Sequence, residues 1–135
     1  EEPFVLVNAD IFANIDFHYL VNQAHQLTVT GRLAHLVMVD NPAHHPQGDF
    51  TLHEDGLLTP GNALTYAGTG VYHPALFSAW AEPQAKRALP LRPVLSNAMH
   101  AHRITGVRHT GYWLDVGTPE RLAAAQRLAM SREQV

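Results

Sequence analysis

The sequence predicts an α/β domain with a mostly parallel sheet and a small antiparallel insertion. Short apolar runs alternate along the chain with segments of helical periodicity, an order that favours a sheet covered by helices. Several of these runs are continuously apolar, as is typical of strands buried on both faces of a parallel sheet. With 135 residues, 46% of them hydrophobic, the chain suits a single domain with its own core.

The first elements follow from apolar runs and a helix cap. Residues 4–7 form an apolar run that ends at the polar segment 8–10, which predicts a strand buried on both faces. Asp16 carries a side chain suited to capping a helix that extends to about residue 26. Residues 34–39 predict a second buried strand.

The middle of the chain predicts a hairpin followed by a strand that contains glycine. Residues 48–58 form the hairpin around Glu54-Asp55-Gly56, because Asp-Gly supplies the positive φ angles of a tight turn. Residues 64–72 form the strand and include Gly68 and Gly70. Glycine inside a strand marks either the close approach of a ligand or backbone or a bulge that needs no ligand.

The remaining elements continue the alternation of helices and strands. Pro74 suits a first helical position and predicts a short helix through Trp80, and another helix is expected between residues 91 and 100. Residues 104–109 and 112–116 predict short strands. A last helix begins at Thr118-Pro119-Glu120, which combines a hydroxyl cap, an N1 proline and an acidic first turn.

Charge and the length of the apolar runs exclude several kinds of partner. Nine basic residues against twelve acidic ones give a formal net charge of -3, and Lys and Arg form no block. We therefore expect no nucleic acid and no membrane among the partners. The apolar runs are too short to span a bilayer, and the absence of cysteine excludes disulfides and thiolate metal sites. We expect a soluble cytoplasmic domain.

Two aspartates are candidates for chemistry because each lies at a predicted strand. Asp10 closely follows the strand 4–7, and Asp115 lies within 112–116. Ligands of open α/β sheets bind beyond the carboxyl ends of the strands, and two carboxylates plus substrate phosphates commonly hold Mg²⁺. Taken singly, an aspartate at a strand end also serves as a turn former or a helix cap, so the residues alone leave both interpretations open.

The ten histidines do not predict a metal site. His44 and His45 lie in a proline-flanked loop, where a histidine pair can bind zinc adventitiously, but no third ligand follows at regular spacing. We interpret them as loop residues that at most shape a pocket. By itself, Asp49 would be read as a partner in a surface ion pair.

Four segments together resemble the sugar-1-phosphate nucleotidyltransferase family. They are VNADIF at 7–12, LVMVDNPAHHPQGDF at 36–50, YAGTGVY at 66–72 and WLDVGTPE at 113–120. The similarity covers nearly all 135 residues. It implies a Rossmann-like (GT-A-like) nucleotidyltransferase fold and an enzyme that joins a nucleoside triphosphate, UTP foremost, to a sugar 1-phosphate such as that of a hexosamine or muramic acid, with release of pyrophosphate.

The resemblance also implies roles for individual residues. In the family, aspartates at the positions of Asp10 and Asp115 hold the catalytic Mg²⁺, so both residues are expected to be catalytic metal ligands. Three further expectations concern the substrates: Asp49 binds sugar hydroxyls, the backbone of Gly68 approaches the sugar, and the segment of Asn8 and Ala9 lies beside the nucleotide.

Other functions remain open at this point. A mannose- or glucose-1-phosphate transferase that uses GTP or another nucleotide is a close alternative, and a non-catalytic module that binds a nucleotide sugar is another. Family members begin with a glycine-rich loop containing Arg and Lys, which this sequence lacks. We therefore expect residues 1–135 to be the C-terminal part of one nucleotidyltransferase domain of peptidoglycan recycling, inactive by itself and prone to self-associate through the edge of strand 4–7.

Overall fold

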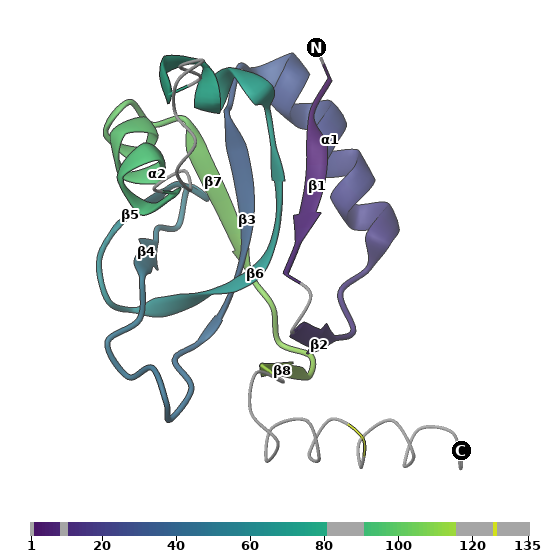
Figure 1. The fold of residues 1–135 in the computed structure, drawn as a ribbon, viewed down its shortest axis with the longest axis vertical. Coiled ribbons are helices and arrows are strands. Elements are labelled where there is room, and N and C mark those ends of the chain that lie inside the picture. The colour runs from purple at the N-terminus through teal and green to yellow at the C-terminus, as the bar shows by residue number, and fades with distance from the viewer. Residues whose placement is uncertain (1, 9–10, 81–90, 116–125, 127–135) are drawn as a thin grey trace.

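The computed structural model describes residues 2–8, 11–80, 91–115 and 126. Eleven elements follow one another in chain order in this part of the chain (Figure 1). They are β1 (Phe4–Val7), β2 (Ile11–Ala13), α1 (Phe17–Thr30), β3 (Ala34–Asp40), β4 (Phe50–Leu52), β5 (Leu58–Pro60), β6 (Leu64–Tyr72), the 3₁₀ helix η1 (Pro74–Trp80), α2 (Leu91–His100), β7 (Ile104–Arg108) and β8 (Trp113–Asp115). The helix predicted from Thr118 onward lies outside the described residues apart from residue 126, which is helical.

The described chain combines a sheet with helices, which confirms the predicted α/β class. The main sheet is mixed, however, so the prediction of a mostly parallel sheet is wrong. Its strand order is β5-β4-β6-β3-β7, and β1 pairs with β6. Among the described strand pairs of this sheet, β3 and β7 are parallel, whereas β6 runs antiparallel to β1, β3 and β4. A continuously apolar run shows that a strand is covered on both faces, but it carries no information on the direction of the neighbouring strands.

Helices cover both faces of this sheet. Alternate residues of β3 point to opposite faces: Leu36 and Met38 pack into a cluster with α2 and η1, and Val37 and Val39 pack against α1. The hydrophobic core is therefore split into two layers by the sheet. Within the described part of the chain, neither helix is long and apolar enough to cross a membrane.

The ends of α1 are determined by local chemistry. The side chain of Asp16 accepts a 2.9 Å hydrogen bond from the backbone N–H of His18, which confirms the predicted cap. The helix extends past residue 26 to Thr30 and ends at Gly31, whose φ of 73° is left-handed. Glycine adopts this conformation without steric cost, so the helix ends there. The predicted helix is shorter because the β-branched residues 28–30 do not continue the helical pattern.

Strand β1 is more exposed than the sequence predicts. Its one pairing among the described strands is with β6. Val7 is 55% exposed and Leu6 is 37% exposed, whereas Val5 packs against the α1 side of the core. The expectation of a strand buried on both faces is therefore wrong for the described molecule, in which β1 lies at an edge (Figure 1).

Strand β6 contains a bulge next to its centre. Two steps along β3, from Leu36 to Met38, correspond to four steps along β6, from Gly70 to Tyr66. The extra residues include Gly68, which has a φ of 84°. The hydroxyl groups of Tyr66 and Tyr72, which lie on either side of Gly68 in the sequence, are 2.7 Å apart. Bulges of this kind redirect a strand locally and are frequent beside binding sites.

Candidate functional site

A groove of about 290 Å³ lies over the bulge of β6. The residues that line it come from β2, β6, β8, the segment after β1 and the loop after β3. They are Asn8, Ile11, His44, His45, Thr65, Tyr66, Gly68 and Trp113. All four segments that carry the family resemblance contribute to this wall, although they are far apart in the sequence.

Gly68 forms the floor of the groove at a close backbone contact. Its carbonyl oxygen accepts a 2.8 Å hydrogen bond from the backbone N–H of Asn8. A Cβ atom at Gly68 would lie 2.9 Å from Nδ2 of Asn8 and 3.0 Å from Cγ1 of Ile11. The glycine therefore meets two requirements at once, a positive φ angle and the close approach of a neighbouring segment.

We expect Gly68→Ala to destabilise the chain more than Gly56→Ala does. Both glycines have positive φ angles, but a Cβ atom at Gly56 would meet open space. The left-handed conformation costs about 1–2 kcal/mol in either variant, and Gly68→Ala must also displace Asn8. Urea unfolding of the two variants measures the difference, and equal losses of unfolding free energy would contradict the close contact at Gly68.

One of the two predicted metal ligands, Asp115, lies in a strand that the structure describes. Strands β2 and β8 form a separate antiparallel pair in which Ile11 lies opposite Asp115. The backbone of Asp115 therefore lies opposite the residue that directly follows Asp10 in the sequence. Ala9 and Asp10 themselves lie outside the described residues.

Trp113 connects β8 to the bulge. Its indole Nε1–H donates a 2.8 Å hydrogen bond to the carbonyl oxygen of Ala67, the residue before Gly68. Since Trp113 also lines the groove, one side chain fixes the position of β8 relative to the groove floor. The sequence motif around Asp115 therefore has a structural role in addition to the predicted chemical one.

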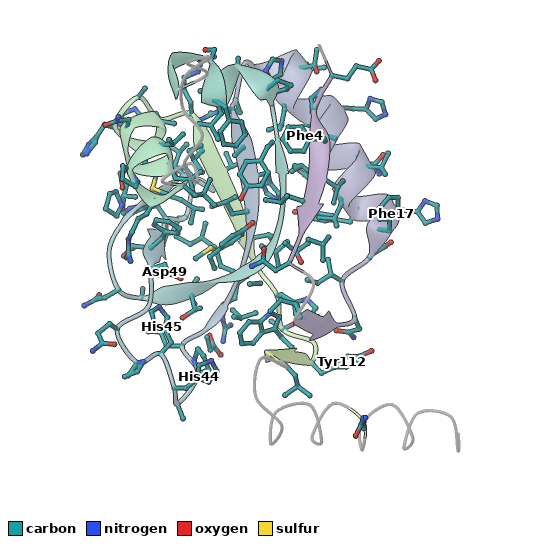
Figure 2. The ribbon with its side chains drawn as sticks, in the orientation of Figure 1. Phe4, Phe17, His44, His45, Asp49 and Tyr112 are labelled. Atoms are coloured by element: carbon teal, nitrogen blue, oxygen red, sulfur yellow. The ribbon has the colours of Figure 1, made fainter. Side chains whose placement is uncertain are left out.

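Asp49 lies beside the groove in a network of donors (Figure 2). Its Oδ2 atom accepts a 2.9 Å hydrogen bond from the backbone N–H of Tyr66, and its Oδ1 atom lies 3.1 Å from Nε2 of His45. Arg92 of α2 approaches the same carboxylate at 3.8 Å. Asp49 is not among the residues that line the groove, whereas His44 and His45 are.

His44 and His45, which the sequence predicts to be loop residues that at most shape a pocket, both line the groove. The spacing of four between His45 and Asp49 was the signal available. Arg92 was not identified, because its approach to Asp49 depends on how α2 packs against the sheet.

The chain is similar in sequence to a known enzyme. No protein-family model matches the chain. The chain is 42% identical, over 132 residues, to the N-acetylmuramate alpha-1-phosphate uridylyltransferase of Neisseria meningitidis serogroup B. The predicted resemblance is confirmed. The match covers 95% of this chain and 55% of the meningococcal uridylyltransferase, so the chain spans about half the length of that relative.

Solved structures of sugar-1-phosphate nucleotidyltransferases share the fold. A Bacillus anthracis protein assigned as a glucose-1-phosphate thymidylyltransferase aligns with a TM-score of 0.72 and 17% identity, over 95% of this chain and 55% of its own. A UDP-glucose pyrophosphorylase in its apo form aligns with a TM-score of 0.67 and 16% identity, over 98% of this chain and 55% of its own. The predicted Rossmann-like nucleotidyltransferase fold is thereby confirmed.

Proposed function

We propose that this chain provides the sugar-phosphate side of a uridylyltransferase that joins UTP and N-acetylmuramate α-1-phosphate, in peptidoglycan recycling. The observation that carries the proposal is the 42% identity along nearly the whole chain to an enzyme of that name. The groove supports it, because its wall is built from the same segments that carry the resemblance. A cytoplasmic location belongs to the same proposal.

The reaction requires positioning rather than a protein nucleophile. An oxygen of the sugar phosphate attacks the α-phosphorus of UTP, the bond from that phosphorus to the bridging oxygen breaks, and pyrophosphate leaves. Catalysis of such a transfer comes from in-line alignment and from stabilisation of charge on the phosphoryl oxygens. In the proposal, Gly68 lets the sugar approach the backbone, and Asp49 takes part in binding the sugar hydroxyls. Asn8 and Ala9 lie beside the nucleotide.

We propose Asp10 and Asp115 as the ligands of a catalytic Mg²⁺. The described residues contain no cluster of three or more potential metal-ligating side chains. A two-carboxylate site still suits this ion, since Mg²⁺ usually takes one or two carboxylates and completes its shell with water and substrate phosphate. The pairing of Ile11 with Asp115 supports the assignment. When bound, the ion would neutralise charge on the reacting phosphates.

A segment exchange tests the function of this chain. In a chimera, the region of the meningococcal uridylyltransferase that this chain matches is replaced by residues 1–135. We expect the chimera to release pyrophosphate from UTP and N-acetylmuramate α-1-phosphate at an ordinary enzymatic rate, about 1–1000 per second. We expect the 135-residue chain alone to show no such turnover, because it lacks the glycine-rich phosphate loop and the charge stabilisation that such a loop supplies.

Two results would count against this proposal. A folded chimera that turns over glucose 1-phosphate or mannose 1-phosphate, but not the muramate substrate, would assign another sugar. A folded chimera that binds sugar phosphates without turnover of any of them would favour a non-catalytic binding module. Turnover by the 135-residue chain alone would contradict the need for the phosphate loop.

We also expect the isolated chain to self-associate through β1. Among the described strands, β1 pairs on one side only, with β6, and the side chains of Leu6 and Val7 are exposed, which is a favourable template for strand pairing. Sedimentation velocity should show an apparent mass that rises with concentration, and Val7→Lys should suppress the rise. Val29→Lys provides the control, since Val29 is an exposed valine of α1 and not part of β1. A monomer at every concentration would contradict the expectation.

A further inference from the structure

His45 and Asp49 form a polar pair whose proton positions follow from the surrounding donors. Asp49 accepts from the backbone N–H of Tyr66 through Oδ2, and its Oδ1 atom faces Nε2 of His45 at 3.1 Å. A carboxylate only accepts hydrogen bonds, so Nε2 of His45 must carry the proton and donate it. In the neutral ring, Nδ1 is then an acceptor.

The two residues differ in their access to the groove. His45 lines it together with Gly68 and Asn8, and its side chain is 36% exposed. The side chain of Asp49 is 20% exposed, is not among the residues that line the groove, and is approached by Arg92. A ligand that enters the groove therefore meets the imidazole ring, while the carboxylate remains occupied by protein donors. Figure 2 shows His44, His45 and Asp49 gathered at the loop between β3 and β4.

We propose that His45 accepts a hydrogen bond from a sugar hydroxyl through Nδ1, and that Asp49 is a positioning residue that fixes the His45 tautomer. This inference rests on the proposed function, and it moves the direct sugar contact from Asp49 to His45. The arrangement follows the general behaviour of histidine, in which the partner of one ring nitrogen decides what the other can do. Sugar hydroxyls present the donors that such an acceptor needs.

The variant Asp49→Asn tests the positioning role. The backbone N–H of Tyr66 retains the amide oxygen as its acceptor, so the amide NH₂ group turns toward Nε2 of His45. That nitrogen must then accept, and the proton moves to Nδ1, which converts Nδ1 from an acceptor to a donor. At about pH 8, where an ordinary histidine is neutral, ¹⁵N NMR of the ring should show the Nε2–H tautomer in the natural chain and the Nδ1–H tautomer in the variant.

Titration with N-acetylmuramate α-1-phosphate tests the sugar contact. The ¹⁵N signal of His45 Nδ1 should shift on binding, and both Asp49→Asn and His45→Ala should weaken the affinity about tenfold, as expected for loss of one hydrogen bond. His53→Ala is the matched control, because His53 pairs with Thr59 on the hairpin and is absent from the groove. It should bind as the natural chain does.

The possible outcomes separate this inference from the proposed function. Shifts at the Gly68 and Asn8 amides with full affinity in His45→Ala would overturn the His45 contact and leave the proposed function standing. An Nδ1–H tautomer in the natural chain would overturn the positioning role of Asp49. No shift at any groove residue, up to about one millimolar sugar phosphate, a thousandfold above a micromolar site, would overturn both proposals.

Discussion

Replacing Asp115 by asparagine is expected to reduce turnover by the chimera about a thousandfold. Asp10→Asn should cause a similar loss, and the double variant should lose less than a further tenfold. The physical reason is that both carboxylates are proposed to hold one ion, so removal of either ligand already misplaces it, and residues that share one task are not additive. A thousandfold loss corresponds to about 4 kcal/mol of transition-state stabilisation.

The measurement is turnover against Mg²⁺ concentration, corrected for the folded fraction of each variant. Glu54→Gln is the control, because Glu54 is an exposed carboxylate at the hairpin turn and its charge change matches that of the other variants. It should leave both turnover and Mg²⁺ dependence unchanged. A near-normal rate for Asp115→Asn at ordinary Mg²⁺ concentrations would defeat the metal assignment.

Acidification is expected to remove about 3 kcal/mol of stability through His35. This histidine is 6% exposed in β3, and its ring nitrogens lie 2.7 Å from the Tyr19 hydroxyl and 2.8 Å from the Thr105 hydroxyl. Burial lowers the pKa of His35 from the ordinary value of 6.5 to about 4. The folded state thus favours the neutral ring, and a shift of this size corresponds to about 3 kcal/mol.

The pKa of His35 is lowered in the folded state, so the unfolded chain binds the proton more readily. The stabilisation is complete above pH 6.5, decreases as the pH falls toward 4, and is fully lost below that value. Urea unfolding at a series of pH values should show this slope, and His35→Leu should flatten it while lowering stability at neutral pH. His25→Gln, on the exposed side of α1, should retain the slope. An unchanged slope in His35→Leu would contradict this origin.

Local elements of the fold were predictable because their signals lie close together in the chain. The cap at Asp16 and the hairpin turn at Asp55-Gly56 depend on neighbouring residues, and the structure places both as predicted. The strand at Leu64–Tyr72 has the predicted bounds. Strand direction was not predictable, because it is decided by contacts between segments that are distant in the sequence.

The candidate site was predictable only in part, for the same reason. Gly68 was singled out from its place inside a strand, and its positive φ and its contact with Asn8 agree with the close approach that such a glycine indicates. The β2–β8 pair was missed in part, since residues 11–13 are too short to show a strand periodicity. The roles of Asp10 and Asp115 stay predictions that depend on the family resemblance.

The contact between His45 and Asp49 depends on a turn in the loop that carries them. The two residues are four apart in the sequence, yet they meet because the chain turns between them. The backbone N–H of His45 donates to the carbonyl oxygen of Pro42, and Gly48 adopts a φ of 62°. Sequence spacing alone does not distinguish this turn from an extended loop, in which the same two side chains would point apart.

Because of the bulge of β6, a related chain could lose the groove and still keep the sheet. It takes up two additional positions opposite β3, and side chains of a strand alternate with a period of two. Loss of two residues at the bulge would therefore leave all the remaining side chains of β6 on the faces that they occupy now. Such a deletion would straighten the strand and remove Gly68 from beneath the groove while conserving the core. The architecture can persist in descendants that have lost the groove, and shared architecture alone is then a poor guide to shared activity.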